Sequence, residues 1–374
     1  MTAPVHADRD IVYTARYYAL PGSHRTSHFH LYRVNPDGTG KTQLTFGTAE
    51  DHDATWSPDG TKIAFTRESE DGRNALCLIR AKNASVQTLM PMGPVGTEET
   101  YGHRWSPDGR LLAVVHVVYQ KDWSASVSLL DTQTGRVIRR FVGASDFFWS
   151  PDARRAYLIT EAGDQLLDLK LGREVMVKNR VEHPVWIDPK TMVGLASDPK
   201  SGIYFLRMVG MDGQETHHLP LLFPAPYAGG GGDSDDPATA LGSLYRRPVL
   251  VYGINEHNST VGVDWAFFRL QLTPNTMRYL TQGQFLAWSP DGLRFCTAPG
   301  RDTTVYDRRR YPFAVPKGAT PQERAEDEHR LVWSAPLYIR AAGGGPMRAL
   351  TPRLSWVTGA DWRKPPKAAL KRSL

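Results

Sequence analysis

Trp56-Ser-Pro-Asp-Gly60 is the stretch that decides the fold, because the same five residues return at Trp105–Gly109 and Trp288–Gly292. A further copy, Trp149–Ala153, differs only in its last residue. Serine, proline, aspartate and glycine in this order are typical of a tight turn: proline presets one dihedral angle, aspartate caps the turn, and glycine accepts a left-handed conformation. A motif that recurs in this way indicates a chain built from copies of one unit.

Each copy of the motif is followed by segments with the composition of strands. After Trp56 these segments are Lys62–Thr66, Ala75–Ile79 and Val86–Leu89, and similar segments follow the next two copies. Short apolar runs separated by turn residues are typical of hairpin-connected strands. The sequence therefore predicts a four-stranded antiparallel meander whose first strand ends at the tryptophan.

Alignment of these units on the tryptophan gives a set of anchors along the whole chain. They are Trp56, Trp105, Trp149, Trp186, Tyr245, Trp288 and Trp362. The copies at Trp186, Tyr245 and Trp362 are degenerate. Seven units result, and six remain as the alternative if Tyr245 is not a true copy.

The two ends of the chain complete one another. Three predicted strands precede the first anchor without an inner strand, at residues 11–15, 28–33 and 42–45. After the last full unit, Val357–Trp362 is an inner strand without outer partners. Joining them closes the sheets into a ring and removes the open edges that would otherwise invite aggregation. We therefore expect an all-β, seven-bladed β-propeller, with six blades as the runner-up, closed by the C-terminal inner strand.

The predicted propeller is one domain, residues 11–362, between an N-terminal extension (1–10) and a basic C-terminal tail (363–374). Residues 299–334 form the longest predicted insertion. Within it, Thr320-Pro-Gln-Glu323 combines a capping residue, a proline at the first helical position and a glutamate at the third. We expect a short helix from there to about Val332.

The charge and the cysteines exclude several classes of protein. The net charge is +6, and the tail carries five basic residues and no acidic one, so the remainder is nearly neutral and does not indicate a nucleic-acid partner. No apolar stretch approaches the roughly 20 residues that span a bilayer, so we expect no membrane insertion. Cys77 and Cys296 lie in apolar runs of units that the closing blade separates. We expect two buried free thiols.

The first ten residues lack the basic and apolar regions of a signal peptide. We therefore expect a cytoplasmic protein, or a periplasmic or exported one if a leader has been removed. We also expect a monomer.

The repeated motif, together with the run Arg33–Thr45 and its echo at Arg340–Thr351, resembles the propeller repeats of TolB and of prolyl-peptidase-type enzymes. The resemblance covers residues 11–362 and implies a fold, not a function. TolB has an additional domain before its propeller, whereas about ten residues precede the first predicted strand here. Prolyl-peptidase-type enzymes add a hydrolase domain with a Gly-x-Ser-x-Gly elbow, a pentapeptide that this sequence lacks. We expect a stand-alone propeller.

The turns of a meander alternate between the two ends of a blade. The turns after the second and fourth strands therefore share one face of the ring, which we call the loop face. This face is predicted to hold all the long connections: residues 20–27, 91–101, 220–238 and 299–334. Long loops on a rigid scaffold are where binding residues usually lie.

Polar residues that precede the anchors are expected near the mouth of the central channel on the loop face. The candidate binding residues are His52, Asp53, Glu98, Glu99, His103, Arg104, Asp146 and His183. Three of these, His52, His103 and His183, are candidate ligands of a divalent metal, with Glu50, Asp51, Glu98 and Glu99 close by in the connecting loops. A hydrated, metal-free channel entrance would account for the same residues. No other cofactor is indicated, and no catalytic residue can be assigned.

Three functions fit these residues. The leading hypothesis is a non-catalytic binding or scaffolding module that holds a protein, peptide or carbohydrate on its loop face. The alternative is a metal-dependent enzyme acting on an acidic polysaccharide, because oligogalacturonate lyases resemble this arrangement of histidines at a propeller mouth. Their histidine-rich segments are not recognisable here. The third is an accessory subunit of a separately encoded peptidase.

Overall fold

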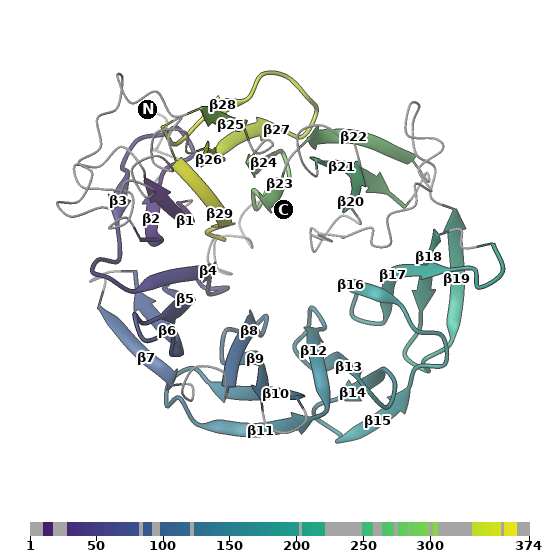
Figure 1. Cartoon of the computed structure of the whole chain (residues 1–374). Helices are drawn as coiled ribbons and strands as arrows, with labels where there is room; N and C mark the ends of the chain where they lie inside the picture. Colours follow the sequence, from purple (N-terminus) through teal and green to yellow (C-terminus); the bar gives the residue numbers. More distant parts are fainter. Residues whose placement is uncertain are drawn as a thin grey trace, which may run out of the picture.

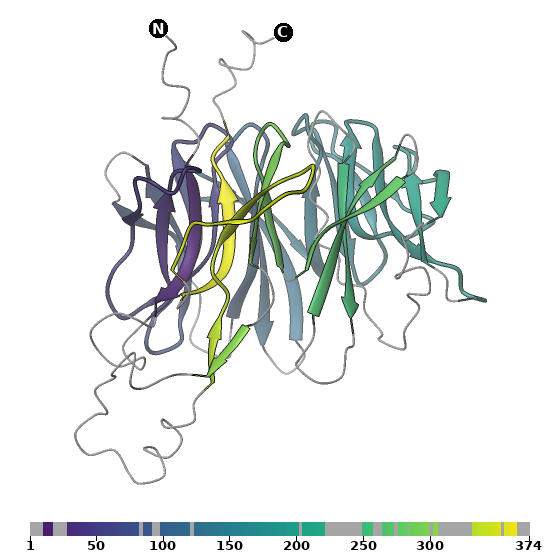
Figure 2. The same cartoon turned by 90° about the horizontal axis from the view of Figure 1, so that it is seen from above.

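Antiparallel sheets stand side by side around a central axis and form a ring (Figure 1). The computed structural model describes residues 10–17, 28–81, 85–91, 98–119, 123–201, 204–220, 249–256, 264–272, 276–282, 284–298, 302–305, 331–352 and 355–364. In these ranges every regular element is a β-strand, and no helix long and apolar enough to cross a membrane is found. The view turned by 90° shows the strands running across the thickness of the ring (Figure 2).

The first half of the ring consists of four regular blades, each numbered from its inner strand to its outer strand. The first blade contains β4 (Glu50–Trp56), β5 (Lys62–Glu68), β6 (Asn74–Arg80) and β7 (Val86–Pro91). The second contains β8 (Glu98–Trp105), β9 (Leu111–Tyr119), β10 (Trp123–Asp131) and β11 (Val137–Val142). The third contains β12 (Ala144–Trp149), β13 (Arg155–Thr160), β14 (Gln165–Asp168) and β15 (Arg173–Met176). The fourth contains β16 (Glu182–Asp188), β17 (Thr191–Ser197), β18 (Tyr204–Val209) and β19 (Glu215–Pro220).

The second half of the ring is less regular. A three-stranded sheet contains β20 (Val249–Glu256), β21 (Asp264–Gln271) and β22 (Thr276–Gln282). The next blade contains β23 (Gln284–Trp288), β24 (Arg294–Ala298), β27 (Tyr338–Ala341) and β28 (Arg348–Ala349). Between its second and third strands, β25 (Asp302–Val305) pairs with β26 (Leu331–Ser334) as a separate hairpin.

The closing blade is assembled from both ends of the chain, as predicted. It orders β29 (Ser355–Trp362), β1 (Ile11–Tyr17), β2 (His30–Val34) and β3 (Thr42–Gln43) from the axis outward. Trp362 is the antiparallel partner of Ile11, and Ser355 is the partner of Tyr17. Both views show β29 (yellow) beside β1 (purple) (Figures 1 and 2).

The all-β propeller with this closure is therefore confirmed. Within the described ranges, six sheets have four strands and the sheet β20–β22 has three. Tyr245, the anchor on which the count of seven depends, lies outside those ranges.

The Trp-Ser-Pro-Asp-Gly turn has the same hydrogen bonds wherever it occurs. In the first blade, the Gly60 amide donates to the Ser57 carbonyl oxygen at 2.8 Å, and the Lys62 amide donates to Ser57 Oγ at 2.9 Å. Ser57 Oγ donates to Asp59 Oδ1 at 2.6 Å, which fixes the serine rotamer. The turns at Ser106, Ser150 and Ser289 repeat this pattern. The motif is thus a self-contained connection between the inner strand and its neighbour.

The tryptophan of the motif joins one blade to the next. The Nε1 groups of Trp105, Trp149 and Trp186 each donate to a backbone carbonyl oxygen of the preceding blade, at 3.3, 3.1 and 3.0 Å. In each case the acceptor residue directly precedes the anchor of that blade, as Thr55 precedes Trp56. In the second, third and fourth blades the indole ring of the anchor is therefore both apolar packing surface and an inter-blade donor, whereas Trp56 Nε1 and Trp362 Nε1 are buried without a hydrogen-bond partner among the described residues.

The hydrophobic core lies between the blades. Ile63 and Phe65 of β5 pack toward the closing blade, whereas Ala64 packs toward the second blade. Because alternate residues of a strand point to opposite faces, a sheet covered on both faces has a continuously apolar strand. Cys77 belongs to the cluster between the closing and first blades, and Cys296 to the cluster on the other face of the closing blade. Both thiols are buried and free, as predicted.

The helix predicted within the insertion at residues 299–334 is wrong at its C-terminal end. The predicted helix extends to about Val332, but Val332 lies in β26, where it pairs with Thr304. The earlier part of that helix, including Thr320, lies outside the described ranges. Val332 is β-branched and lies in a short apolar run, so its preference for a strand outweighs the helix-start signal at Thr320.

The copy of the turn that ends in alanine is predicted to be strained. Ala153 has a φ of 59°, whereas Gly109 at the same place has a φ of 75°. Left-handed backbone costs an L-residue more than it costs glycine, so Ala153→Gly should raise the free energy of unfolding by about 0.5–1 kcal/mol. Gly109→Ala should lower it by a similar amount, because a Cβ there would meet only Pro58 Cδ, at 3.6 Å. Urea unfolding monitored by tryptophan fluorescence measures both changes; equal stability of all three proteins would show that neither turn carries this strain.

Candidate functional site

The inner strands that surround the axis share an irregularity. In each of β4, β8, β12, β16, β23 and β29 the register with the neighbouring strand shifts a few residues before the anchor tryptophan. In β4, for example, His52 is the partner of Thr66, but Thr55 is the partner of Ala64, so one residue is extra. A bulge of this kind bends the strand and changes the direction of its side chains.

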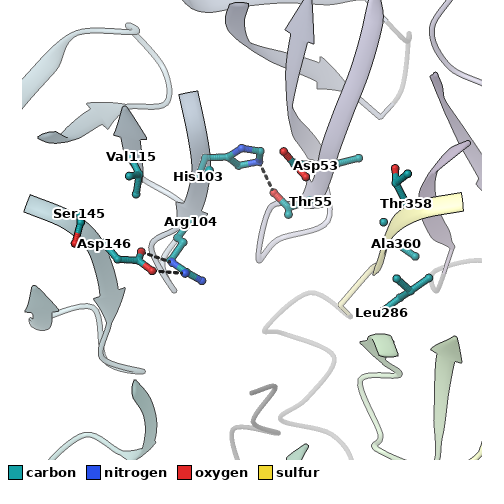
Figure 3. A pocket seen from close by; sticks show the side chains of 13 residues that line it. Asp53, Thr55, His103, Arg104, Val115, Ser145, Asp146, Leu286, Thr358 and Ala360 are labelled. Atoms are coloured by element: carbon teal, nitrogen blue, oxygen red, sulfur yellow. Dashed lines mark hydrogen bonds and ion pairs between the residues drawn. The ribbon is translucent and has the colours of Figure 1, made fainter. Parts of the chain in front are cut away.

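A cavity of about 410 Å³ lies in the channel at these bulges (Figure 3). Its polar wall includes Asp53, Thr55, His103, Arg104 and Asp146 from three successive blades. This volume lies within the range of ordinary small-ligand pockets.

Apolar groups form another part of the cavity wall. Leu286 of β23 and Ala360 of β29 lie across the channel from Arg104 and Asp146 (Figure 3). Val115 of β9 also lines the cavity. The cavity therefore offers a polar side and an apolar side.

His103 is held in place and uncharged. Its Nε2 shares a hydrogen bond of 2.9 Å with Thr55 Oγ1 on the neighbouring blade. The residue is 8% exposed, and loss of hydration lowers the pKa of His103 from 6.5 to about 4, against the opposing effect of Asp53. The imidazole is therefore neutral at physiological pH.

Arg104 and Asp146 neutralise each other across the boundary between the second and third blades. Arg104 Nε donates to Asp146 Oδ1 at 3.1 Å, and Nη2 donates to Oδ2 at 2.9 Å. The guanidinium group also lies 4.3 Å from the centroid of the Phe148 ring. Two parallel hydrogen bonds and an aromatic face together restrict the arginine to one orientation.

Asp53 differs from the other charged residues of the cavity. Its backbone has a φ of 55°, because it lies in the bulge of β4. Its side chain is exposed to the channel, and it makes no hydrogen bond or ion pair with any other residue that the structure describes. Asp53 therefore offers an unpaired carboxyl group to a ligand.

The structure brings together four of the eight candidate residues: Asp53, His103, Arg104 and Asp146. His52 is half-buried, with its ring centroid 5.3 Å from that of Phe29, and His183 is exposed. Glu98 and Glu99 lie in β8, so their predicted position in a connecting loop is wrong, and their side chains are not among those that the structure describes.

The structure does not gather the three histidines of the candidate metal site. Of the three, His103 alone lines the cavity. In the described part of the chain, no group of three or more His, Cys, Asp or Glu side chains is placed to hold a metal ion.

Glu50 and Asp51 lie in β4, so their predicted position in a connecting loop is wrong. Glu50 accepts a hydrogen bond from Arg16 Nη2 at 2.7 Å. Asp51 is fully buried and accepts two hydrogen bonds from Arg67, at 2.7 and 3.0 Å. These carboxylates attach strands to one another, which takes them out of the candidate site.

Sequence reasoning missed several residues of the cavity. Thr55, Ser145, Leu286 and Thr358 line it but are absent from the predicted set. The last three stand two to four positions before an anchor tryptophan. A count of positions back from each tryptophan is therefore the signal that would have found them.

Comparison with known proteins supports the fold. Neither a protein-family model nor a curated protein matches this chain. The structure of TolB from Acinetobacter baumannii is similar with a TM-score of 0.52 and 14% identity, over 96% of this chain and 67% of that one. Acylaminoacyl peptidase from Pyrococcus horikoshii gives a TM-score of 0.57 and 14% identity over 93% of this chain, which spans about half (52%) of the peptidase.

The propeller domain of the trilobed protease from Pyrococcus furiosus is similar at a comparable level. Its TM-score is 0.55 at 13% identity, over 93% of this chain and 98% of that domain. At such identities the likeness shows a shared β-propeller fold and leaves the function to be argued from the site.

The buried His103 should make stability depend on pH. Its folded-state pKa lies below the value of 6.5 for an unperturbed histidine, so its contribution is complete above pH 6.5 and is lost as the pH falls toward 4. Between pH 7 and pH 5 this residue should remove about 1–2 kcal/mol of unfolding free energy. His103→Gln should flatten that dependence in urea unfolding, and His217→Gln, on the exposed strand β19, should not. An unchanged slope in His103→Gln would show that the imidazole is not buried as described.

Proposed function

We propose that this protein is a non-catalytic binding module that holds its ligand in the cavity of the central channel. The observation that carries the proposal is the convergence of Asp53, His103, Arg104 and Asp146, from three blades, on one cavity of about 410 Å³. These residues stand on strands of a closed ring, and a rigid scaffold places binding groups with little entropic cost on association.

The state of the polar groups favours binding over catalysis. A general base is most effective when its pKa lies near the working pH, whereas the pKa of His103 is about 4. Its Nε2 is also engaged by Thr55. Arg104 is paired with Asp146, so it is not free to stabilise a developing negative charge. The groups are positioned to recognise a shape and a charge pattern.

The electrostatics of the cavity argue against the alternative, an enzyme for acidic polysaccharides. Such a substrate needs unpaired cations or a metal ion along its path. Among the lining residues that the structure describes, Arg104 is the cation, and its ion pair with Asp146 neutralises it. The carboxyl group of Asp53, by contrast, has no partner there. We therefore propose a peptide or protein segment as the ligand, entering from the loop face.

We also propose that the ring has seven blades. The second strands β5, β9, β13, β17 and β24 each pair with an inner strand, whereas β20 pairs only with β21 among the described residues. Tyr245, the predicted anchor of this unit, lies outside the described ranges. The number of blades matters for function, because it sets the width of the channel.

Filling the cavity tests the proposed function. Ser145 lies exposed in the bulge of β12 and lines the cavity, so Ser145→Trp should occupy it. Against a panel of capped tripeptides and of neutral and acidic oligosaccharides, at least one peptide should raise the melting temperature of the wild type saturably, and Ser145→Trp should abolish the shift. Gln133→Trp, in the exposed turn after β10, is the matched control and should keep it.

Two results would refute a non-catalytic peptide-binding role for the cavity. One is that none of the panel gives a shift sensitive to Ser145→Trp. The other is chemical conversion of a bound compound, detected by mass spectrometry and lost in Ser145→Trp, which would show an enzyme instead.

A further inference from the structure

The cavity has a net negative charge although the protein is basic overall. Besides His103, its described lining residues include three with acidic or basic side chains, Asp53, Arg104 and Asp146, and the last two are joined by two hydrogen bonds. His103 is neutral because it is buried. One carboxylate remains without a counter-ion, in a chain whose net charge is +6. In a partly enclosed channel this carboxylate attracts cations more strongly than it would at an open surface.

The backbone at Asp53 is held in a costly conformation. A φ of 55° is uncommon for residues other than glycine, and aspartate and asparagine are among those that tolerate it best. The bulge lies between two paired positions, His52 with Thr66 and Thr55 with Ala64, which hold it at both ends. Strained residues that the surrounding structure holds in place are frequent at ligand sites.

The remaining walls suit the stem of a long cationic side chain. Leu286 and Ala360 offer apolar surface across the channel from the Arg104–Asp146 pair (Figure 3). An ammonium or guanidinium group on an alkyl chain buries its methylene groups against such a surface and keeps its charged end at polar partners. Thr55 and Ser145 add hydroxyl groups to the polar side.

We propose that the cavity recognises a cationic group, a primary ammonium or a guanidinium on an alkyl stem, with the Asp53 carboxylate as its counter-ion. This inference rests on the proposed binding function and specifies the chemistry of the ligand. The cation can belong to a lysine or arginine of a peptide or to a free amine, and Asp53 serves both in the same way.

Isothermal titration calorimetry at low salt tests the proposal with three compounds. They are capped Gly-Lys-Gly, its Nε-acetyl-lysine analogue, which has the same backbone and no charge, and 1,5-diaminopentane. The lysine peptide or the diamine should bind the wild type at least tenfold more tightly than the acetylated peptide, and 0.5 M salt should weaken the binding. Binding of the peptide alone identifies a protein segment as the source of the cation, and binding of the diamine alone identifies a small amine.

Asp53→Asn removes the charge but keeps the size and the tolerance for left-handed backbone, so the variant should fold with an unchanged melting temperature. It should lose at least tenfold in affinity for the cationic compound. Asp71→Asn makes the same change in charge at an exposed turn between β5 and β6 and should bind like the wild type. Equal affinity for lysine and acetyl-lysine peptides, or an unaffected Asp53→Asn, would overturn the inference. If those peptides nevertheless lose binding in Ser145→Trp, the cavity still binds and only its charge preference is wrong.

Discussion

The backbone pairing of β29 with β1 is the constraint on which the rest of the structure depends. Each blade buries its apolar residues against the blades on either side, and in an open arc the two terminal sheets would expose such faces to water. The pairing from Ile11–Trp362 to Tyr17–Ser355 gives the closing blade its inner strand. Trp362 then becomes one of the largest fully buried side chains of the protein. Closure thus converts sheets that are separately unstable into one cooperative ring.

Further contacts reinforce the closure at the same point. The backbone amide of Trp56 in β4 donates to Asp361 Oδ2 in β29 at 2.7 Å. This hydrogen bond joins the last inner strand to the end of the first. Arg363 reaches the neighbouring turn, where its Nε donates to the Gly60 carbonyl oxygen at 2.8 Å and its guanidinium group lies 5.1 Å from the Trp56 ring centroid. Loss of hydration raises the pKa of Asp361 above its usual range, although Lys364 and the two backbone amides oppose this effect. The residues that join the ends therefore contact the first copy of the repeated motif.

The ring could be predicted from the sequence because its signals are local and repeated. The proline, aspartate and glycine of each turn act within five residues, and the strand alternation acts within seven. Both patterns can be recognised in the sequence without knowing which strands pair with each other. The bulges cannot be read in this way, because an extra residue in an inner strand becomes apparent only when the neighbouring strand is aligned with it. The cavity depends on those bulges, so its residues were only partly found.

The histidines show the same limit. His52, His103 and His183 stand four, two and three residues before their anchors, so the bulged strands present them at different heights and in different directions. Asp53 and His103 were found because polar residues near an anchor often line the channel, but their charge states depend on burial and pairing. Burial and pairing cannot be read from the sequence, so the buried Asp51, which is bonded to Arg67, could not be distinguished from an unpaired carboxylate such as that of Asp53.

Amide hydrogen exchange of the unmodified protein tests the closure most directly. In a closed ring the amides of residues 11–17 and 355–362 should exchange slowly and at matching rates, because the two strands protect each other and open only when the ring unfolds as a whole. Protection in both segments comparable to that of β5 and β9 would agree with this prediction. Rapid exchange in either segment, with the β5 and β9 amides still protected, would show that the ends of the chain are not joined and would contradict the closed ring.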